Sequence, residues 1–241
     1  MEIYTITYQD QTITYTIYRK KVKNITLKVK ADSTVVVSAH QKVSPAKVRL
    51  FVKSKAPWIV KNIRHFETIA RKYNSYEYKD GEEFLFLGQK HTLKVIQDII
   101  RKEEVIHDHD KLLAFVKDGS NDQRIKKLLE QWYKKQAKII FDLTVDRILP
   151  LLPEKNLKKP SITIRTMKTR WGSCSWQKGK ITLNTLLIKA PQDCIDYVVL
   201  HELAHFINRR HDAAFYSYIA AIMPNWKERR KTLKELAYQC L

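Results

Sequence analysis

Residues 201–211 read HELAHFINRRH, and three of the chain's eight histidines lie within them. Because an α-helix turns about 100° per residue, His201 and His205 project from the same side, one turn apart. Glu202 lies about 100° around the helix, so it can share a pocket with them without becoming a ligand. In such an arrangement two imidazoles hold a zinc ion and the carboxylate handles the attacking water. The spacing therefore predicts a zinc centre.

His211 can join the other two histidines only if the helix ends before it. A continuous helix would turn His211 about 240° away from His205. Asn208 stands between them, and asparagine is the next-best residue after glycine for the left-handed conformation that ends helices. We expect the chain to reverse there, which leaves one coordination position open for water. Otherwise Glu228 or Glu235 would have to supply the third ligand.

The composition allows one large hydrophobic core or two smaller ones. The chain has 241 residues, 44% of them hydrophobic, and no apolar run approaches the roughly eighteen residues of a membrane span. The opening, MEIYTITYQDQTITY, is polar and alternating, unlike a secretory signal. Three widely spaced cysteines argue against a disulfide framework. We expect a cytoplasmic protein without a membrane partner.

The net charge is +20, and the excess of Lys and Arg lies mainly towards the two ends of the sequence. Such a surface attracts nucleic acids or acidic proteins over long distances. No nucleic-acid-binding motif accompanies the charge, and a solvated basic face explains it equally simply. We expect weak nucleic-acid binding through the basic surface and leave its role open.

The first part of the chain predicts a β-rich domain. Residues 2–38 alternate apolar and polar side chains and are rich in Ile, Val, Thr and Tyr, a pattern typical of antiparallel strands. From Ser44 the apolar residues follow helical spacing, with Pro57 bending or dividing the helix. Strands resume within residues 83–96. The polar run KDGSND, residues 117–122, is the best candidate for a linker.

The second part predicts another arrangement, with no visible sequence repeat. A long amphipathic helix spans roughly Gln123–Ile148, and strands follow at Ser161–Met167 and Lys180–Ile188 before the H-E-x-x-H helix. The fold class is α+β. Residues 1–118 form an antiparallel β-rich domain with a helix, and residues 119–241 combine a long helix, a small sheet, the motif helix and C-terminal helices.

The strand before the metal helix commonly forms one wall of the cleft in zinc peptidases. An exposed edge strand there can take up a substrate backbone as an added strand. Lys180–Ile188 is the candidate for such an edge, and a plain interior strand fits its spacing equally well.

Just upstream, residues 169–174 read TRWGSC. Together with GKITLNTLLIKAP, DYVVLHELAH and the His211 spacing, this segment resembles the YgjP-like metallopeptidase family, zincins related to the SprT-like and M48 metallopeptidases. The likeness covers nearly the whole chain, including RKKVKNITLKV, APWI, DGEEFLFLG and WYKKQA. Asn24, where a serine is common, and Tyr216, where a tryptophan is usual, are small departures.

The resemblance implies a zincin-like metallopeptidase domain at residues 119–241. It implies Glu202 as the catalytic carboxylate and a zinc ion bound by His201, His205 and His211.

The role of the TRWGSC segment does not follow from spacing. Gly172 would let a strand bulge or a substrate approach closely. Arg170 could polarise a substrate carbonyl or bind a carboxylate. For Trp171 and Cys174 we favour packing and cleft-wall roles. The group that stabilises the oxyanion is not identifiable from the sequence, and Arg170 and Tyr216 are the candidates.

These observations predict a zinc-dependent metallohydrolase, in first place a peptidase that acts on peptides or proteins with Glu202 as general base. One alternative is a metal-dependent nucleoside triphosphate pyrophosphohydrolase of the UTP type, a label that some family members carry. The basic surface suits a triphosphate, but no P-loop and no carboxylate cluster for Mg²⁺ is evident. Another is a SprT-like nucleic-acid-associated protease. A binding module without catalysis is disfavoured because Glu202 is retained, and the oligomeric state does not follow.

Overall fold

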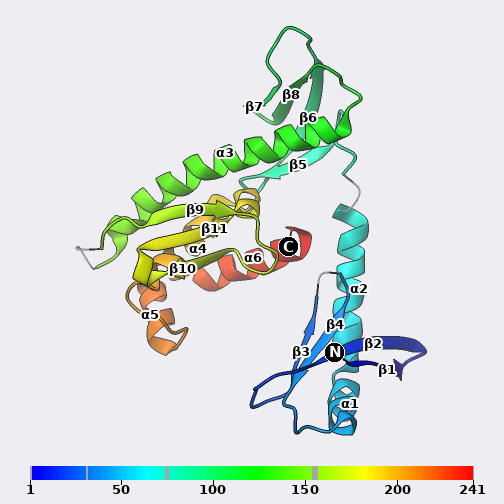
Figure 1. Cartoon of the computed structure of the whole chain (residues 1–241). Coiled ribbons are helices and arrows are strands. Elements are labelled where there is room, and N and C mark those ends of the chain that lie inside the picture. Colours follow the sequence, from blue (N-terminus) through cyan, green and yellow to red (C-terminus); the bar gives the residue numbers. More distant parts are fainter. Residues whose placement is uncertain (1, 31, 74–75, 154–156, 241) are drawn as a thin grey trace. The chain divides into compact units, whose positions relative to one another are not determined.

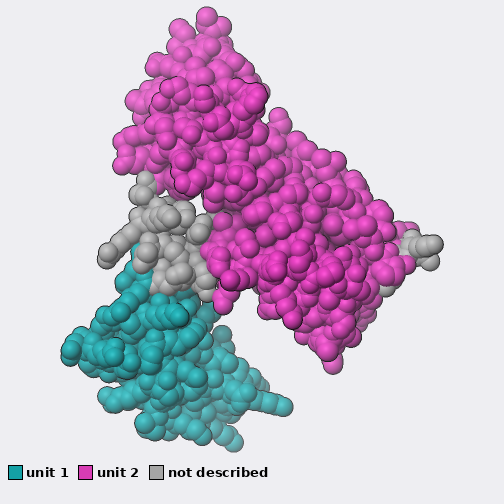
Figure 2. Space-filling model, turned by 180° about the vertical axis from the view of Figure 1, so that it is seen from behind, with its two compact units in different colours: residues 1–75 teal, residues 76–241 magenta. Residues whose placement is uncertain are grey.

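A computed structural model describes residues 2–30, 32–73, 76–153 and 157–240. Within them the chain forms 6 α-helices and three small sheets (Figure 1). Two compact units result, Met1–Ser75 (unit 1) and Tyr76–Leu241 (unit 2), coloured separately in Figure 2. The boundary expected between residues 118 and 119 falls inside unit 2. The α+β class expected from the sequence is confirmed.

Unit 1 is built on a four-stranded sheet, sheet A, with the spatial order β1-β2-β4-β3. Its strands are β1 (Glu2–Tyr8), β2 (Gln11–Arg19), β3 (Thr26–Val29) and β4 (Val35–Ala39). The pairs β1–β2 and β3–β4 are antiparallel, but β2 and β4 run parallel. The expectation of purely antiparallel strands is therefore corrected. Alternation determines which face a side chain takes, and it does not determine the direction of the partner strand.

Two helices, α1 (Pro45–Ser54) and α2 (Ala56–Tyr73), complete unit 1. The Ser44 hydroxyl accepts a hydrogen bond from the Lys47 amide at 3.3 Å and caps α1. The helices divide just before Pro57, as the sequence predicts. Their apolar faces and one face of sheet A form a core of fully or nearly fully buried side chains, which include Ile6, Ile13, Tyr15, Ile17, Val37, Val48, Val52 and Ile59.

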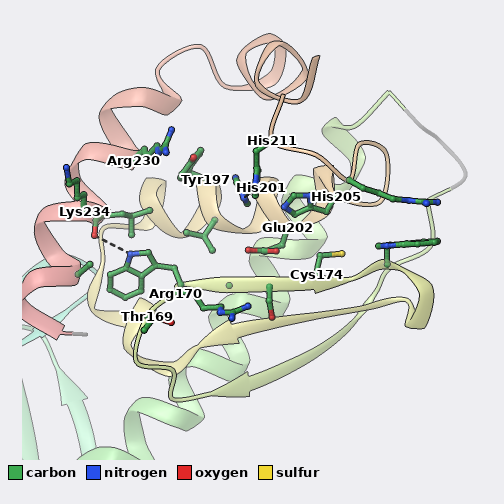
Figure 3. A pocket seen from close by; sticks show the side chains of 18 residues that line it. Thr169, Arg170, Cys174, Tyr197, His201, Glu202, His205, His211, Arg230 and Lys234 are labelled. Atoms are coloured by element: carbon green, nitrogen blue, oxygen red, sulfur yellow. Dashed lines mark hydrogen bonds between the residues drawn. The ribbon is translucent and has the colours of Figure 1, made fainter. Parts of the chain in front are cut away.

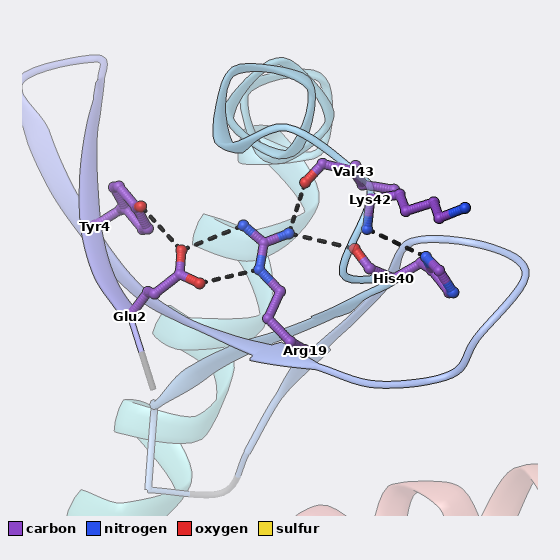
Figure 4. A network of polar contacts seen from close by, with 6 residues as sticks. All are labelled: Glu2, Tyr4, Arg19, His40, Lys42 and Val43. Atoms are coloured by element: carbon purple, nitrogen blue, oxygen red, sulfur yellow. Dashed lines mark hydrogen bonds and ion pairs between the residues drawn. The ribbon is translucent and has the colours of Figure 1, made fainter.

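Arg19 ties the ends of three segments of unit 1 together (Figure 4). Its guanidinium donates to the Glu2 carboxylate at 3.0 and 3.2 Å, and to the backbone carbonyls of Val43 at 2.6 Å and His40 at 3.4 Å. The hydrogen bond from Arg19 holds the pKa of Glu2 below its ordinary value. One side chain thus joins β1, β2 and the loop that leads into α1.

Unit 2 begins with a second four-stranded sheet, sheet B, of the same topology. Its strands are β5 (Glu83–Phe86), β6 (Gln89–Gln97), β7 (Glu104–Asp108) and β8 (Lys111–Val116), in the order β5-β6-β8-β7. Here too the outer pairs are antiparallel and the central pair, β6 and β8, is parallel. The structure therefore contains a topological repeat that is not visible in the sequence.

The long helix α3 (Asp122–Ile148) agrees closely with its predicted span. Asn121 caps it by accepting a hydrogen bond from the Arg124 amide at 3.0 Å, so the KDGSND run is the loop that starts α3 and not a linker between units. The Trp132 ring lies 4.8 Å from that of Phe86 in sheet B. Further along, α3 packs against the helix that carries H-E-x-x-H (Figure 1). The helix α3 therefore packs against both sheet B and the helix that carries H-E-x-x-H.

A three-stranded sheet, sheet C, follows, with the order β10-β11-β9. Its strands are β9 (Ser161–Arg165), β10 (Gly172–Ser175) and β11 (Lys180–Asn184). Since β11 pairs with β9 on one side and β10 on the other, it is the interior strand. The proposed edge at Lys180–Ile188 is thus wrong, and β10 is an edge strand instead. Residues 185–189 leave the sheet in a 3₁₀ turn.

Three helices end the chain: α4 (Gln192–Ala204), α5 (Ala213–Ile222) and α6 (Trp226–Cys240). The order of long helix, small sheet, motif helix and C-terminal helices agrees with the sequence analysis. Asp212 caps α5 by accepting a hydrogen bond from the Phe215 amide at 3.0 Å. Among the residues that the structure describes, no helix is long and apolar enough to cross a bilayer.

Candidate metal centre and cleft

A cleft of about 910 Å³ opens in unit 2, with walls from β10, α4, the loop after α4, and α6 (Figure 3). Its lining side chains include all three motif histidines and Glu202. The segment that reads TRWGSC forms one wall, and the cleft is further lined by Trp176, Tyr197, Val198, Arg209, Arg230, Leu233, Lys234 and Ala237.

The structure brings the three motif histidines together. One ring nitrogen from each of His201, His205 and His211 lies within 4.8 Å of the others. The Nε2 atoms of His201 and His211 are 2.9 Å apart, so their lone pairs converge on the same space. Neither Glu228 nor Glu235 belongs to this cluster.

The chain reverses between His205 and His211 by another route than the sequence suggested. Asn208 is not among the described residues with a positive φ, so the expected left-handed turn is wrong. Instead its amide N–H donates to the Ala204 carbonyl at 2.9 Å, and its side-chain amide donates to Asp212 Oδ1, also at 2.9 Å. The side chain of Asn208 thus bridges the two ends of the loop on which His211 lies.

The Asn208 carbonyl also orients a histidine. It lies 3.2 Å from His205 Nδ1, and an N–H there would leave Nε2 with its lone pair free. The backbone and the side chain of one asparagine therefore position both His205 and the loop before His211.

The electrostatics of the histidines suit a metal ion. Burial first, and then the neighbouring His205 and His211, lower the pKa of His201 to about 3. Burial likewise lowers the pKa of His205. Both rings are therefore neutral at physiological pH, the form that binds metals. His201 Nδ1 is buried and has no hydrogen-bond partner among the residues that the structure describes. Three converging imidazoles fit a divalent cation of the zinc type.

Glu202 lies against the edge strand. Glu202 is only 5% exposed. If residue 172 had a side chain, its Cβ would lie 2.5 Å from Glu202 Oε1. Gly172 therefore provides the space for this carboxylate, and β10 pairs with β11 without a bulge. Burial raises the pKa of Glu202 to about 8, while the charge of Arg170 acts in the opposite direction. A cation held by the adjacent histidines would also favour the carboxylate form.

The other residues of the TRWGSC segment line the cleft or fasten its wall. Arg170 lies two residues before β10 and Cys174 lies near its end, and both line the cleft. Burial raises the pKa of the Cys174 thiol to about 12, which keeps it protonated. Trp171 Nε1 donates to the Leu233 carbonyl of α6 at 3.2 Å. The packing and cleft-wall roles expected for Trp171 and Cys174 match these positions.

Tyr216 does not line the cleft. Its ring is stacked on Trp226 at 4.8 Å, with Arg230 over it at 5.7 Å, so it supports the wall from behind. The tyrosine that does line the cleft is Tyr197, which the sequence analysis passed over. It stands one helical turn before His201, and the spacing rule that joined His201 to His205 would have found it.

The cationic side chains of the cleft were also missed individually. Arg209 lies over the Trp176 ring at 3.5 Å, and Arg230 and Lys234 project from α6 (Figure 3). Arg230 and Lys234 are four residues apart, so they share one face of α6. Only that spacing signalled them in advance, since α6 carries other Lys and Arg residues that do not line the cleft.

The chain resembles known metallopeptidases in sequence and, over part of its length, in structure. Two crystal structures of metallopeptidase zymogens resemble part of the chain: abylysin of Pyrococcus abyssi, with 21% identity and a TM-score of 0.36, and jannalysin of Methanocaldococcus jannaschii, with 24% and 0.35. They cover 39% and 40% of this chain, and 90% and 96% of their own. No curated protein matches in sequence. The sequence model of the YgjP-like metallopeptidase domain matches residues 23–236, and the chain belongs to the YgjP-like family.

Proposed function

We propose that this protein is a zinc metallopeptidase with His201, His205 and His211 as ligands and Glu202 as general base. The observation that carries the proposal is the convergence of three imidazole nitrogens within 4.8 Å, beside a buried carboxylate that faces the same cleft. Membership of a metallopeptidase family supports a metal-dependent peptidase, and the donor set supports zinc.

When bound, zinc polarises a carbonyl and lowers the pKa of water in its open coordination position. The residues of the chain do the rest. Glu202 follows His201 directly, so its carboxylate faces the space next to the ligand nitrogens. There it takes a proton from the attacking water and delivers it to the leaving amine. Arg170, which lines the same cleft, is our candidate for stabilising the oxyanion.

The edge strand supports a peptide as the substrate. Residues 172–174 of β10 line the cleft, and in sheet C β10 has a partner strand, β11, on one side only. A substrate in extended conformation can add to the other side through main-chain hydrogen bonds, which gives affinity with little sequence preference. The free edge that the sequence analysis sought at Lys180–Ile188 is therefore supplied by β10.

The cleft offers little support for a nucleoside triphosphate. Enzymes that hydrolyse triphosphates hold Mg²⁺ through carboxylates, and Glu202 is the only carboxylate among the lining residues that the structure describes. Three imidazoles favour zinc over Mg²⁺. The peptidase assignment is thus better supported than the pyrophosphohydrolase.

One panel of assays tests the proposal. The purified protein should contain about one zinc per chain, and the zinc-loaded protein should hydrolyse unfolded proteins or peptides and leave UTP intact. Glu202→Gln should retain zinc and fold but lose about 10²- to 10⁴-fold in rate, because only the proton carrier is removed. Glu228→Gln, which changes a glutamate outside the cleft, is the matched control and should behave as the parent.

Two results would overturn the proposal. Loss of zinc in Glu202→Gln would make Glu202 a ligand. Hydrolysis of UTP in place of peptides, with the same dependence on Glu202, would replace the peptidase by the pyrophosphohydrolase.

A further inference from the structure

The charges that line the cleft are strongly unbalanced. Apart from the histidines, the charged lining side chains are four cations and one carboxylate, Glu202. The carboxylate is buried, whereas the four cations are exposed on the walls. They are Arg170, Arg209, Arg230 and Lys234.

These cations differ from five of the arginines outside the cleft, whereas Arg49, Arg165 and Arg210, among the described residues, also have no carboxylate within ion-pair distance. Arg19, Arg101, Arg124, Arg147 and Arg229 each lie within ion-pair distance of a carboxylate. In the part of the chain that the structure describes, none of the four cleft cations has such a partner. Arg209 rests on the Trp176 ring at 3.5 Å, and Arg230 lies over the rings of Tyr216 and Trp226 at 5.7 and 6.0 Å. Aromatic faces hold the guanidinium groups in place and leave their charge available to a ligand.

The cations also occupy both ends of the edge strand. Arg230 and Lys234 come from α6, which Trp171 fastens to the start of β10. Trp176, whose ring lies under the Arg209 guanidinium, directly follows the end of β10 at Ser175. A chain laid along β10 would thus meet positive charge before and after it passes the histidines.

We propose that the cleft selects peptides that carry Asp or Glu on both sides of the cleaved bond. This inference rests on the proposed peptidase function and names its substrate class. Arg230 and Lys234 would bind acidic side chains at one end of the substrate, and Arg209, held by Trp176, those at the other. The charge also attracts acidic segments to the cleft before they dock.

The aromatic groups of the cleft favour a peptide over a single-stranded nucleic acid. Proteins that bind single strands present open aromatic faces on which bases stack. Here Trp176 is covered by Arg209, and Tyr197 is stacked on Trp226. The free edge of β10 matches a polypeptide backbone and has no counterpart in a phosphodiester chain.

Binding to the zinc-loaded Glu202→Gln protein tests the charge selection without turnover. Three fluorescein-labelled peptides of equal length carry Glu, Gln or Lys around a common centre, and anisotropy measures their Kd. We expect the Glu peptide to bind about 10-fold tighter than the Gln peptide, roughly what one or two strong exposed ion pairs supply. The preference should shrink with added salt. Equal binding of the Glu and Gln peptides would overturn the inference.

Charge reversals with matched controls locate the preference. Arg209→Glu and Lys234→Glu should each abolish most of it, whereas Arg210→Glu and Lys231→Glu, which change the net charge equally outside the cleft, should keep it. If all four variants lose the preference equally, the general surface charge is responsible and the inference is wrong. Tighter binding of a labelled oligonucleotide than of the Glu peptide, sensitive to the two cleft variants only, would assign the cleft to nucleic acid.

Hydrolysis separates this inference from the proposed function. The active protein should cleave the Glu peptide with a kcat/KM about 10-fold above that of the Gln peptide, the ratio expected from binding. Cleavage of both at equal rates would refute the charge selection and leave the peptidase standing. Selective binding of the Glu peptide without cleavage of any peptide would refute the peptidase and leave the charge selection standing.

Discussion

Sheets A and B have the same topology, but sheet A forms a core with its own helices, whereas sheet B shares the core of the metal centre. Each consists of two hairpins whose inner strands pair in parallel, in the order 1-2-4-3. In unit 1 the helices that follow the sheet, α1 and α2, close a core of its own. In unit 2 the helix that follows, α3, continues into the core around α4. A four-stranded sheet can thus be a separate unit or a part of another core, depending on its helix.

Backbone contacts strengthen the attachment of sheet B. The amides of Leu87 and Gly88, in the turn between β5 and β6, donate to the carbonyls of Ile188 and Lys189 at 3.0 and 3.1 Å. Gly88 has φ +81°, and a Cβ there would come 2.7 Å from Pro191, at the start of α4. A close turn and a shared helix therefore join sheet B to the element that bears His201 and His205.

The comparison predicts that truncating a buried side chain affects different parts of the chain in the two units. Phe141 of α3 and Ile59 of α2 are both fully buried. Phe141→Ala should cost about 3–5 kcal/mol and raise amide exchange in α4 as well as α3, and Ile59→Ala should cost about 2–5 kcal/mol and affect unit 1 alone. Hydrogen exchange measured across the full chain distinguishes them. If Ile59→Ala also loosened α4, the two units would not be energetically separate.

Removal of zinc should likewise reduce the stability of unit 2 and leave that of unit 1 unchanged. A ligand that binds only the folded state stabilises it by about 2.7 kcal/mol when its free concentration is a hundred times Kd. All three histidines belong to unit 2, so a chelator should lower protection in α4 and α5 and leave sheet A unchanged. Equal loss of protection in sheet A would contradict the assignment of the metal to unit 2 alone.

The loop before His211 offers a smaller and more specific effect. Asn208→Gly removes the bond to Asp212 and the bond that Arg210 N donates to Asn208 Oδ1 at 3.1 Å. Because φ at position 208 is not positive, glycine brings no compensating relief. We expect zinc affinity to fall about 10- to 100-fold, as for other partners that orient ligands. Arg210→Gly adds the same flexibility but keeps these bonds, so its zinc affinity should stay near the parent's.

What the sequence predicted well are features with a local physical cause. The span of α3 follows from its apolar period. The shared face of His201 and His205 needs only the helical repeat, and the structure places both in one cluster. Each of these conclusions needs only residues that are neighbours along the chain.

What the sequence could not predict depends on partners far along the chain. The interior place of β11 is decided by β9 and β10, and its own spacing carries no trace of it. The sequence pointed to Asn208 as the residue at which the chain reverses. It did not show that Asp212, besides capping α5, accepts a hydrogen bond from the Asn208 side chain, because that bond joins the two ends of the loop. Tyr197 lines the cleft, whereas Tyr216 is stacked on Trp226 outside the cleft lining. Such differences arise from packing and are absent from local patterns.

The smallest predicted effect concerns the bond between Trp171 and α6. Trp171→Phe keeps an aromatic ring in the wall and loses only the donor to the Leu233 carbonyl, at a cost of about 0.5–1.5 kcal/mol. Since α6 carries Arg230 and Lys234, a looser α6 should raise KM for peptides with several Glu residues more than it lowers kcat. The control is Trp58→Phe, which changes a half-exposed tryptophan of unit 1 and should alter neither constant. If kcat fell in Trp171→Phe while KM stayed unchanged, Trp171 would act on the chemistry at Glu202, which lies against the neighbouring Gly172, and not on the position of α6.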